Sequence, residues 1–316
     1  MTVENFYCLQ FHIISYNIAI SYTEAVVEDI KKHLLERYDA SSDVQGLVLM
    51  HNTERYPFHT NEYVYYVLVV SSLELITRKI EHLEIENERI FIRTVHIKDI
   101  ENPSVSFSRY HLMDWLLTGE IISDPQGVLE ELKEQILEFP EELRNQRKLK
   151  AYSGFIESLF HAKRNMTESN TLDAYSQILV AIHHWAHIVL IEEGLHPELT
   201  VWKQLRKVHP GIYKLYEELI ASPESIDQRV ELVMLACEFS VMSKMKDCCS
   251  YLLELMKEKN EAWSISELQM HPKLRYIAED ITLVIQKLVQ GHLLKEVATF
   301  NNDQVDEVIE LRYMLP

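Results

Sequence analysis

The chain has 316 residues, more than the roughly 100 to 200 of an ordinary domain, so we expect two or three domains. With 47% hydrophobic and 25% charged residues, the composition is that of a globular protein and argues against a disordered or membrane-spanning chain. Lys and Arg number 31 against 49 Asp and Glu, and this net charge of -18 excludes a general phosphate-neutralising surface such as that of a histone.

Glycine and cysteine patterns exclude several common sites. The 7 glycines are dispersed, so neither a Walker A loop nor a dinucleotide-binding fingerprint can be assembled. The cysteines at positions 8, 237, 248 and 249 contain no C-x-x-C pair, which suits neither a zinc site nor a disulfide framework. We therefore expect free thiols and a cytoplasmic location, where thiols stay reduced.

Residues 1–22 include an apolar run, residues 6–20, that must be distinguished from a targeting segment. A secretory signal needs a charged start, but the first basic residue is Lys31. Polar residues interrupt the run, which is also too short to span a membrane. We interpret residues 1–22 as an extension or an extra strand, and an over-long assigned start of the reading frame is the alternative.

Residues 23–140 are predicted to form a small α/β domain. Apolar residues at helical spacing after Thr23 predict a helix that ends near Asp39. Segments rich in β-formers predict three strands, at residues 46–50, 63–70 and 89–97. A helix end, a short strand and a turn follow over residues 115–125, and a last helix runs up to Pro140.

The rest of the chain is predicted to contain two more domains. Apolar-periodic segments without a strand pattern fill residues 141–245, which indicates an all-α helical bundle. Residues 246–316 contain a different order of predicted elements: helix 247–259, a short strand at 263–265, helices from 266 and 281–290, and strands 293–300 and 305–313. This order is typical of a winged helix-turn-helix. The expected fold class is therefore multidomain α+β.

Two segments of the helical region, residues 172–202 and 213–219, resemble the bacterial nucleotidyltransferase-like proteins. The resemblance extends from about Thr23 to the C-terminus, and residues 119–125 are similar to the strand and aspartate that close the core of such proteins. It implies a core of the polymerase-β type, a helical substrate-binding-like domain and a C-terminal helix-turn-helix.

The resemblance also shows which catalytic motifs differ. Active transferases of the polymerase-β type carry Gly-Ser after the first strand, whereas this chain has His51 and Asn52. They carry Asp-x-Asp on the next strand, where residues i and i+2 hold two Mg²⁺, but here Glu62 is followed by Val64 and Tyr66. The third predicted strand offers no carboxylate. We expect no catalytic residue, no metal site and no cofactor.

Histidines in the helical domain are candidates for a ligand cleft. His183 and His187 have the spacing of a two-histidine metal pair, but no carboxylate base lies between them. A more polar stripe lies opposite Leu172 and its apolar neighbours, and it contains Asp173, Gln177, Val180, His184 and His187. We expect this stripe to face the first domain and to make interdomain hydrogen bonds, with a ligand cleft and a metal site as alternatives.

One local basic cluster is a candidate for phosphate binding. It consists of Arg144, Arg147, Lys148 and Lys150 at the start of the helical domain. A solvated helix face is the ordinary interpretation of such a cluster. Phosphate binding is the functional alternative.

Three functions follow in order of preference. The first is a catalytically degenerate nucleotidyltransferase-like protein that binds a nucleotide or a macromolecular partner. The second is an active transferase on a small acceptor, which would need Mg²⁺ and substitute carboxylates. The third is a DNA-binding regulator, but Lys287 is the only basic residue in residues 281–290. We therefore expect the C-terminal domain to contact protein and not duplex DNA.

Overall fold

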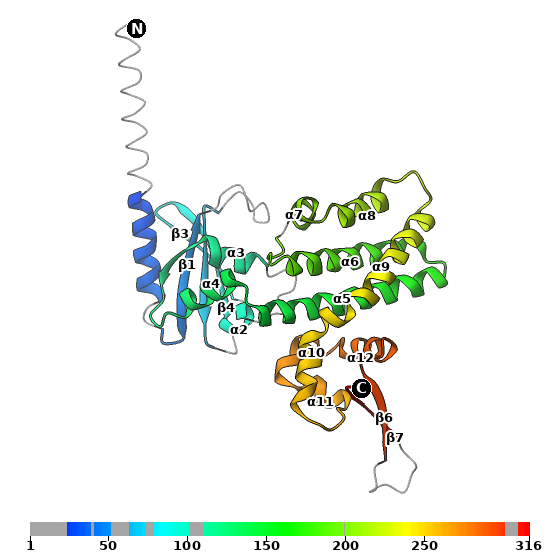
Figure 1. Cartoon of the computed structure of the whole chain (residues 1–316). Coiled ribbons are helices and arrows are strands. Elements are labelled where there is room, and N and C mark those ends of the chain that lie inside the picture. Colours follow the sequence, from blue (N-terminus) through cyan, green and yellow to red (C-terminus); the bar gives the residue numbers. More distant parts are fainter. Residues whose placement is uncertain are drawn as a thin grey trace. The chain divides into compact units, whose positions relative to one another are not determined.

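The computed structural model describes residues 24–38, 41–51, 63–73, 79–101, 110–198, 200–300 and 309–316. These residues form two compact units, which Figure 1 shows in sequence colours. The sheet unit contains the described residues up to Leu137, and the helical unit contains those from Glu138 onward. The fold is therefore α+β, as the sequence predicts.

A five-stranded mixed sheet forms the centre of the sheet unit. Its strands follow the order β3-β4-β2-β1-β5, and only β2 and β4 pair in parallel. The strands are β1 (Val44–His51), β2 (Tyr65–Ser71), β3 (Ile80–Ile85), β4 (Glu88–His96) and β5 (Glu120–Ser123). The three predicted strands and the short strand are present, whereas β3 was not predicted.

Helices pack on the sheet and fix the positions of its strands. The helix at residues 24–38 packs Ile30 and Leu34 against alternate residues of β1, β2 and β4. A side-chain carbon on Gly119 would lie 2.5 Å from Cγ1 of Val48, so glycine permits the close approach of this residue to β1. The sheet unit also contains α2 (Ile97–Glu101), α3 (Tyr110–Thr118) and α4 (Val128–Glu138).

The carboxylate of Asp124 binds the backbone at the start of α4. Its Oδ2 atom accepts hydrogen bonds from the backbone N–H groups of Leu129 and Glu130, each at 3.0 Å. A carboxylate at this end of a helix satisfies free N–H groups and interacts favourably with the helix dipole. The aspartate that closes the core thus caps a helix.

Five long or medium helices form the bundle of the helical unit. They are α5 (Glu141–Thr167), α6 (Thr171–Glu192), α7 (Val201–Val208), α8 (Pro210–Ala221) and α9 (Ile226–Cys248). Helices α5 and α6 lie side by side and α9 packs on both (Figure 1). Helix α6 is long and apolar enough to cross a membrane, but 61% of its most apolar window is buried, as in the central helix of a bundle.

The C-terminal elements continue the same hydrophobic core. They are α10 (Ser250–Leu255), the 3-10 helix η2 (Met256–Glu258), α11 (Ile265–Met270), the 3-10 helix η3 (Pro272–Ile277), α12 (Ile281–Gln290), β6 (Lys295–Phe300) and β7 (Ile309–Met314). Residues of α12 share one core with Tyr152 and Phe155 of α5. The predicted boundary at residue 245 lies within α9, because that helix continues to Cys248. The predicted helix 247–259 is therefore divided, and the predicted strand at Trp263 is a single bridge to Tyr313.

Candidate functional site

The residues that replace the transferase motifs, His51, Asn52 and Glu62, are also candidates for lining a cleft, and His51 lies at the end of β1. His51 is exposed, pairs in register with Tyr65 of β2, and places its ring edge-on at 5.2 Å from the ring of Tyr65. Asn52 and Glu62 lie outside the described residues. Of the three candidates near the sheet, the structure therefore places only His51.

Strand β2, which the resemblance compares with the Asp-x-Asp strand, is buried along its whole length. Tyr66 lies within 5.7 Å of the Phe91 ring and 5.3 Å of the Trp115 ring, measured between centroids. Beside them, the hydroxyl of Tyr63 and Nδ1 of His82 form a hydrogen bond of 2.9 Å. Burial raises the pKa of Tyr66, which favours its neutral form. This face of the sheet presents packed aromatic rings.

A pocket of about 440 Å³ lies between the helix at residues 24–38 and β5. Lys31 lines the pocket and forms ion pairs with Glu28 at 2.9 Å and Glu120 at 2.8 Å. Hydrogen bonds with Glu120 and then Glu28 raise the pKa of Lys31. Lys31, one of the two lysines that line the pocket, thus has carboxylate partners within the sheet unit.

The histidines of α6 are in a largely apolar environment. His187 is buried, its ring lies 4.8 Å from that of His183, and His183 in turn lies 5.9 Å from the ring of Trp202. Burial lowers the pKa of His184 to about 4 and that of His187 well below its usual range, with a smaller contribution from His183 in both cases. These imidazoles are neutral at pH 7 and can donate or accept hydrogen bonds.

His184 packs directly against α5. A side-chain carbon on Gly154 would lie 2.5 Å from both Cε1 and Nε2 of the His184 ring, so the ring uses the space that glycine leaves. The predicted stripe on α6 is wrong as a continuous face, because its members Val180 and His187 differ in burial, Val180 being exposed and His187 buried, and because Leu172, placed on the opposite face, is exposed. Asp173, the remaining candidate, is exposed in the N-terminal half of α6. The structure thus separates Asp173 from the two candidate histidines by burial.

One group of potential metal ligands occurs among the described residues, and it does not include the histidine pair. Carboxylate oxygens of Glu192 and Asp247 and the sulfur of Cys248 lie within 4.8 Å of one another. Glu192 forms an ion pair with Lys244 at 2.5 Å, and Asp247 forms one with Lys148 at 2.7 Å. Burial raises the pKa of Cys248, which disfavours the thiolate that a metal needs. The group is an ion-pair cluster.

The basic cluster of α5 is largely internal. Arg147 and Lys148 are buried, so the expectation of a solvated helix face is wrong for both. The guanidinium of Arg147 lies 2.9 Å from Nδ1 of His196 and 5.3 Å from the ring of Phe139. The rings of Phe139 and His196 are stacked at 3.9 Å. The guanidinium of Arg144 lies beside Gly194, where a side-chain carbon would be 3.7 Å from it.

Sequence reasoning missed His196 and Phe139 as members of this cluster. His196 is in the Gly194–Pro197 segment, which the apolar periodicity of the sequence indicated only as a break between two helices. Phe139 was predicted only as the last residue of a helix. The backbone of Phe139 adopts a positive φ of 44°, which is uncommon for an aromatic residue. A histidine beside glycine and proline was the available signal, but it did not indicate an arginine partner 49 residues earlier.

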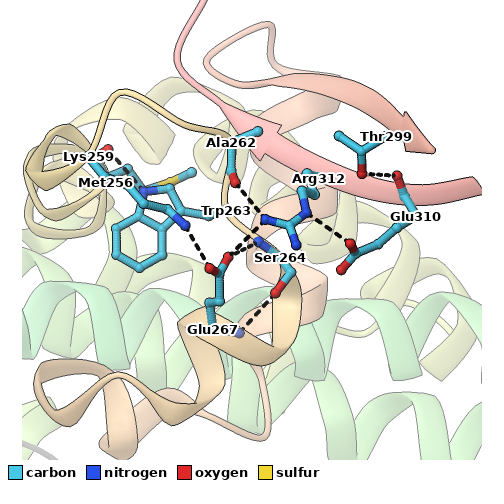
Figure 2. A network of polar contacts seen from close by, with 9 residues as sticks. All are labelled: Met256, Lys259, Ala262, Trp263, Ser264, Glu267, Thr299, Glu310 and Arg312. Carbon is cyan, nitrogen blue, oxygen red and sulfur yellow. Dashed lines mark hydrogen bonds and ion pairs between the residues drawn. The ribbon is translucent and has the colours of Figure 1, made fainter. Parts of the chain in front are cut away.

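Four basic residues of the C-terminal elements, Lys257, Lys259, Lys273 and Arg312, form ion pairs with carboxylates. Figure 2 shows Lys259 and Arg312 converging on Glu267 of α11, at 2.8 Å and 3.7 Å. Arg312 also pairs with Glu310 at 2.9 Å, and the indole N–H of Trp263 donates to the carbonyl of Met256 (Figure 2). The pair of Arg312 with Glu267 connects β7 to α11, and these ion pairs reduce the positive charge that could bind phosphates.

Helix α12, in the position of a recognition helix, is also packed against the bundle. Its residues Ile281, Val284, Ile285 and Leu288 are buried in the common core. The carboxylate of Asp280, which precedes α12, accepts hydrogen bonds from Lys150 at 3.0 Å and from Ser153 at 3.1 Å, both on α5. Burial and then the nearby Lys163 lower the pKa of Lys287.

Comparisons with known proteins match all three parts of the chain. Family models match at residues 27–144 (nucleotidyltransferase-like), 145–244 (YgxA-like substrate binding domain) and 250–304 (helix-turn-helix domain). The protein YgxA of Bacillus subtilis (strain 168) is 33% identical over 218 residues, which are 68% of this chain and 73% of YgxA. A crystal structure of a nucleotidyltransferase-like protein from Exiguobacterium sibiricum 255-15 has the same fold, with a TM-score of 0.80 and 24% identity over 90% of this chain and 98% of that chain.

Proposed function

The chain belongs to the family of nucleotidyltransferase-like proteins that includes YgxA, and we propose that it binds a nucleotide without transferring it. Strand β2 supports this proposal, because in an active transferase of the polymerase-β type the strand that follows the first would carry the paired carboxylates. The strand reads Tyr-Tyr-Val-Leu-Val-Val-Ser from Tyr65 to Ser71 and is buried throughout.

Two-metal phosphoryl transfer requires carboxylates that neutralise both ions and orient the attacking and leaving oxygens. Residues i and i+2 of a strand point to the same face, so Tyr66 and Leu68 occupy one such pair of positions on β2. Neither supplies a carboxylate. The aromatic packing of Tyr66 with Phe91 and Trp115 supports a structural role for this face.

Nucleotide binding is assigned in this proposal to the helical unit, whose family model is described as a substrate binding domain. Arg147 is the favoured phosphate contact because a guanidinium can bind phosphate oxygens in a bidentate manner. His196 lies beside it at 2.9 Å, and Phe139 stacks on His196.

Calorimetric titration of the full chain with the common nucleoside triphosphates, with and without Mg²⁺, tests binding. We expect saturable binding that Mg²⁺ does not require and that Arg147→Gln weakens at least about tenfold, a loss of about 1.4 kcal/mol. Lys133→Gln, a substitution on α4 of the sheet unit, serves as the control. No binding of any nucleotide would transfer the proposal to a macromolecular partner.

Incorporation of labelled nucleoside triphosphate into small-molecule, tRNA and protein acceptors tests the absence of transfer. We expect no turnover above background with Mg²⁺ or Mn²⁺. Robust turnover that disappears in Glu62→Ala would instead establish an active enzyme with substitute carboxylates. In that case Mg²⁺ would be a cofactor.

For the C-terminal elements we propose protein contact and not duplex DNA binding. The ion pairs of Lys259, Lys273 and Arg312 support this, because DNA affinity depends largely on cations that neutralise phosphates. Fluorescence anisotropy of the full chain with genomic fragments at low salt should show binding no tighter than roughly 10⁻⁴ M. Sub-micromolar binding with a steep salt dependence would favour the DNA-regulator function.

A cytoplasmic location is part of the same proposal. Cys237, Cys248 and Cys249 are free thiols buried in the helical unit. Free thiols are typical of a reducing compartment. Fractionation of cells that produce the tagged full chain should recover it with the soluble cytoplasmic proteins, and recovery outside the cytoplasm would contradict the proposal.

A further inference from the structure

Helix α9 has apolar side chains on two opposite faces. One face, which includes Val230, Val233 and Cys237, is buried in the bundle. The other face carries four exposed apolar side chains, here called the α9 stripe: Leu232, Leu235, Phe239 and Met242, with exposed fractions of 54%, 63%, 78% and 54%. A surface helix ordinarily places polar residues on this outer face.

The α9 stripe has the spacing of a helix-pairing seam. Its residues are separated by three, four and three positions, so they follow a line along one side of the helix, as do the apolar positions of a coiled coil. Exposed Leu residues that occur singly need no explanation. A contiguous apolar line rimmed by polar residues, in contrast, marks an interaction surface.

We propose that the α9 stripe binds the α9 stripe of a second copy of this chain, with the two helices antiparallel. Charge favours this occupant and this orientation. Glu231 lies near the start of α9 and Lys246 lies in its last turn, and both are in line with the stripe. Antiparallel pairing brings Lys246 of each copy to the acidic end of the other, whereas parallel pairing would place like charges together.

A two-fold axis near the middle of the stripe matches its residues. If the axis crosses α9 at the level of position 237 along the helix, Leu235 of one copy lies opposite Phe239 of the other, and Leu232 lies opposite Met242. The same patch then serves both copies, as a two-fold interface requires. Glu238 flanks this axis, and its charge is already countered by Lys163 of the same chain at 2.8 Å. The antiparallel helix dipoles add a favourable contribution.

The first test is the mass of the full chain in solution, measured by sedimentation velocity over a range of concentrations. We expect a species of twice 37.2 kDa that increases with concentration. Phe239→Glu should convert it to the monomer. Met270→Glu is the matched control, because Met270 is 79% exposed on α11 and outside the stripe, and this variant should still dimerise. Circular dichroism melts establish that both variants fold.

A charge exchange tests the orientation. Lys246→Glu should weaken the dimer several-fold, and adding Glu231→Lys in the same chain should restore it. The two residues are 15 positions apart, about 22 Å along the helix, so they cannot contact each other within one chain. A chain that stays monomeric at every concentration, or a dimer indifferent to Phe239→Glu, overturns the proposal. A dimer that depends on Phe239 without restoration by the exchange overturns the antiparallel orientation.

Discussion

The interiors of the sheet unit and the helical unit differ in their polar groups. Strand β2 is filled with aliphatic and aromatic side chains, whereas the bundle buries Arg147, Lys148 and His187. Burying charge or imidazole costs free energy unless partners compensate for the lost water, so apolar packing is the simpler way to stabilise a core. The difference teaches that the sheet unit is stabilised mainly by apolar packing, whereas the helical unit retains buried polar groups, and these are the groups to which we assign ligand binding in our proposal.

The largest expected effect comes from placing a carboxylate in the sheet. Tyr66→Asp should lower the free energy of unfolding by about 4 kcal/mol or more, because it leaves a cavity and buries a polar group. Tyr66→Phe, the control, should cost only about 1 kcal/mol. Urea unfolding measures both. A Tyr66→Asp variant as stable as the natural protein would show that this face tolerates the carboxylates of a metal site.

Acid should weaken the protein through its neutral histidines. The pKa of His184 is about 4 in the folded protein because of burial, against about 6.5 when unfolded. The unfolded chain therefore binds more protons between these values, so this contribution is complete above pH 6.5 and is lost as the pH falls toward 4, by up to about 3 kcal/mol. The urea concentration at the midpoint of unfolding should fall less steeply with falling pH in the His184→Gln variant than in the natural protein. His161→Gln, which replaces a half-exposed histidine of α5, is the matched control for loss of an imidazole.

Filling the space beside His184 should have a smaller effect. Gly154→Ala places a methyl group within 2.5 Å of the imidazole, and we expect a loss of about 2 kcal/mol from overpacking. Gly211→Ala is the control, since its methyl group would be 3.4 Å from His209 and alanine favours a helix. Thermal and urea unfolding of both variants measure the effect. Equal stability of the two would mean that His184 does not pack against α5.

The smallest effect concerns an ion pair at the edge of the bundle core. Asp247→Asn removes the charged partner of the buried Lys148 and should cost about 1 to 2 kcal/mol. Adding Lys148→Met should recover part of this loss, because the charge is then absent. For comparison, Glu254→Gln breaks an exposed pair with Lys257 and should cost less than about 0.5 kcal/mol. A double-mutant cycle from urea unfolding gives the coupling.

The sequence pattern predicted the buried elements better than the edge of the sheet. The run at β2 is rich in β-formers and is a strand, and residues 281–290 are a helix with the predicted bounds. Strand β3 was missed because its side chains alternate between half-buried and exposed, with Glu81 and Glu84 among them. Its turn uses Glu86 and Asn87, both at positive φ, in place of the glycine that usually marks such a hairpin.

The candidate site was less predictable because it depends on contacts between distant residues. The spacing of His183 and His187 indicated neighbouring rings, and they are neighbours. Spacing within α6 could not show that Gly154, 30 positions before His184, provides room for that ring. Nor could the charge of Arg147 indicate burial, since a run of basic residues on a helix usually faces solvent.

The common core of the bundle and the C-terminal elements limits how far the chain is modular. The family matches end at residue 244 and begin again at residue 250, yet α9 continues past residue 244 to Cys248, and Cys249 and Leu252, which follow it, are fully buried in the same core. Transplanting the helix-turn-helix alone would expose the inner face of α12 to water. The smallest part of the chain that could be transferred with its core intact therefore includes α5 and α9. A substitution on the inner face of α5 must fit both the other bundle helices and the C-terminal elements.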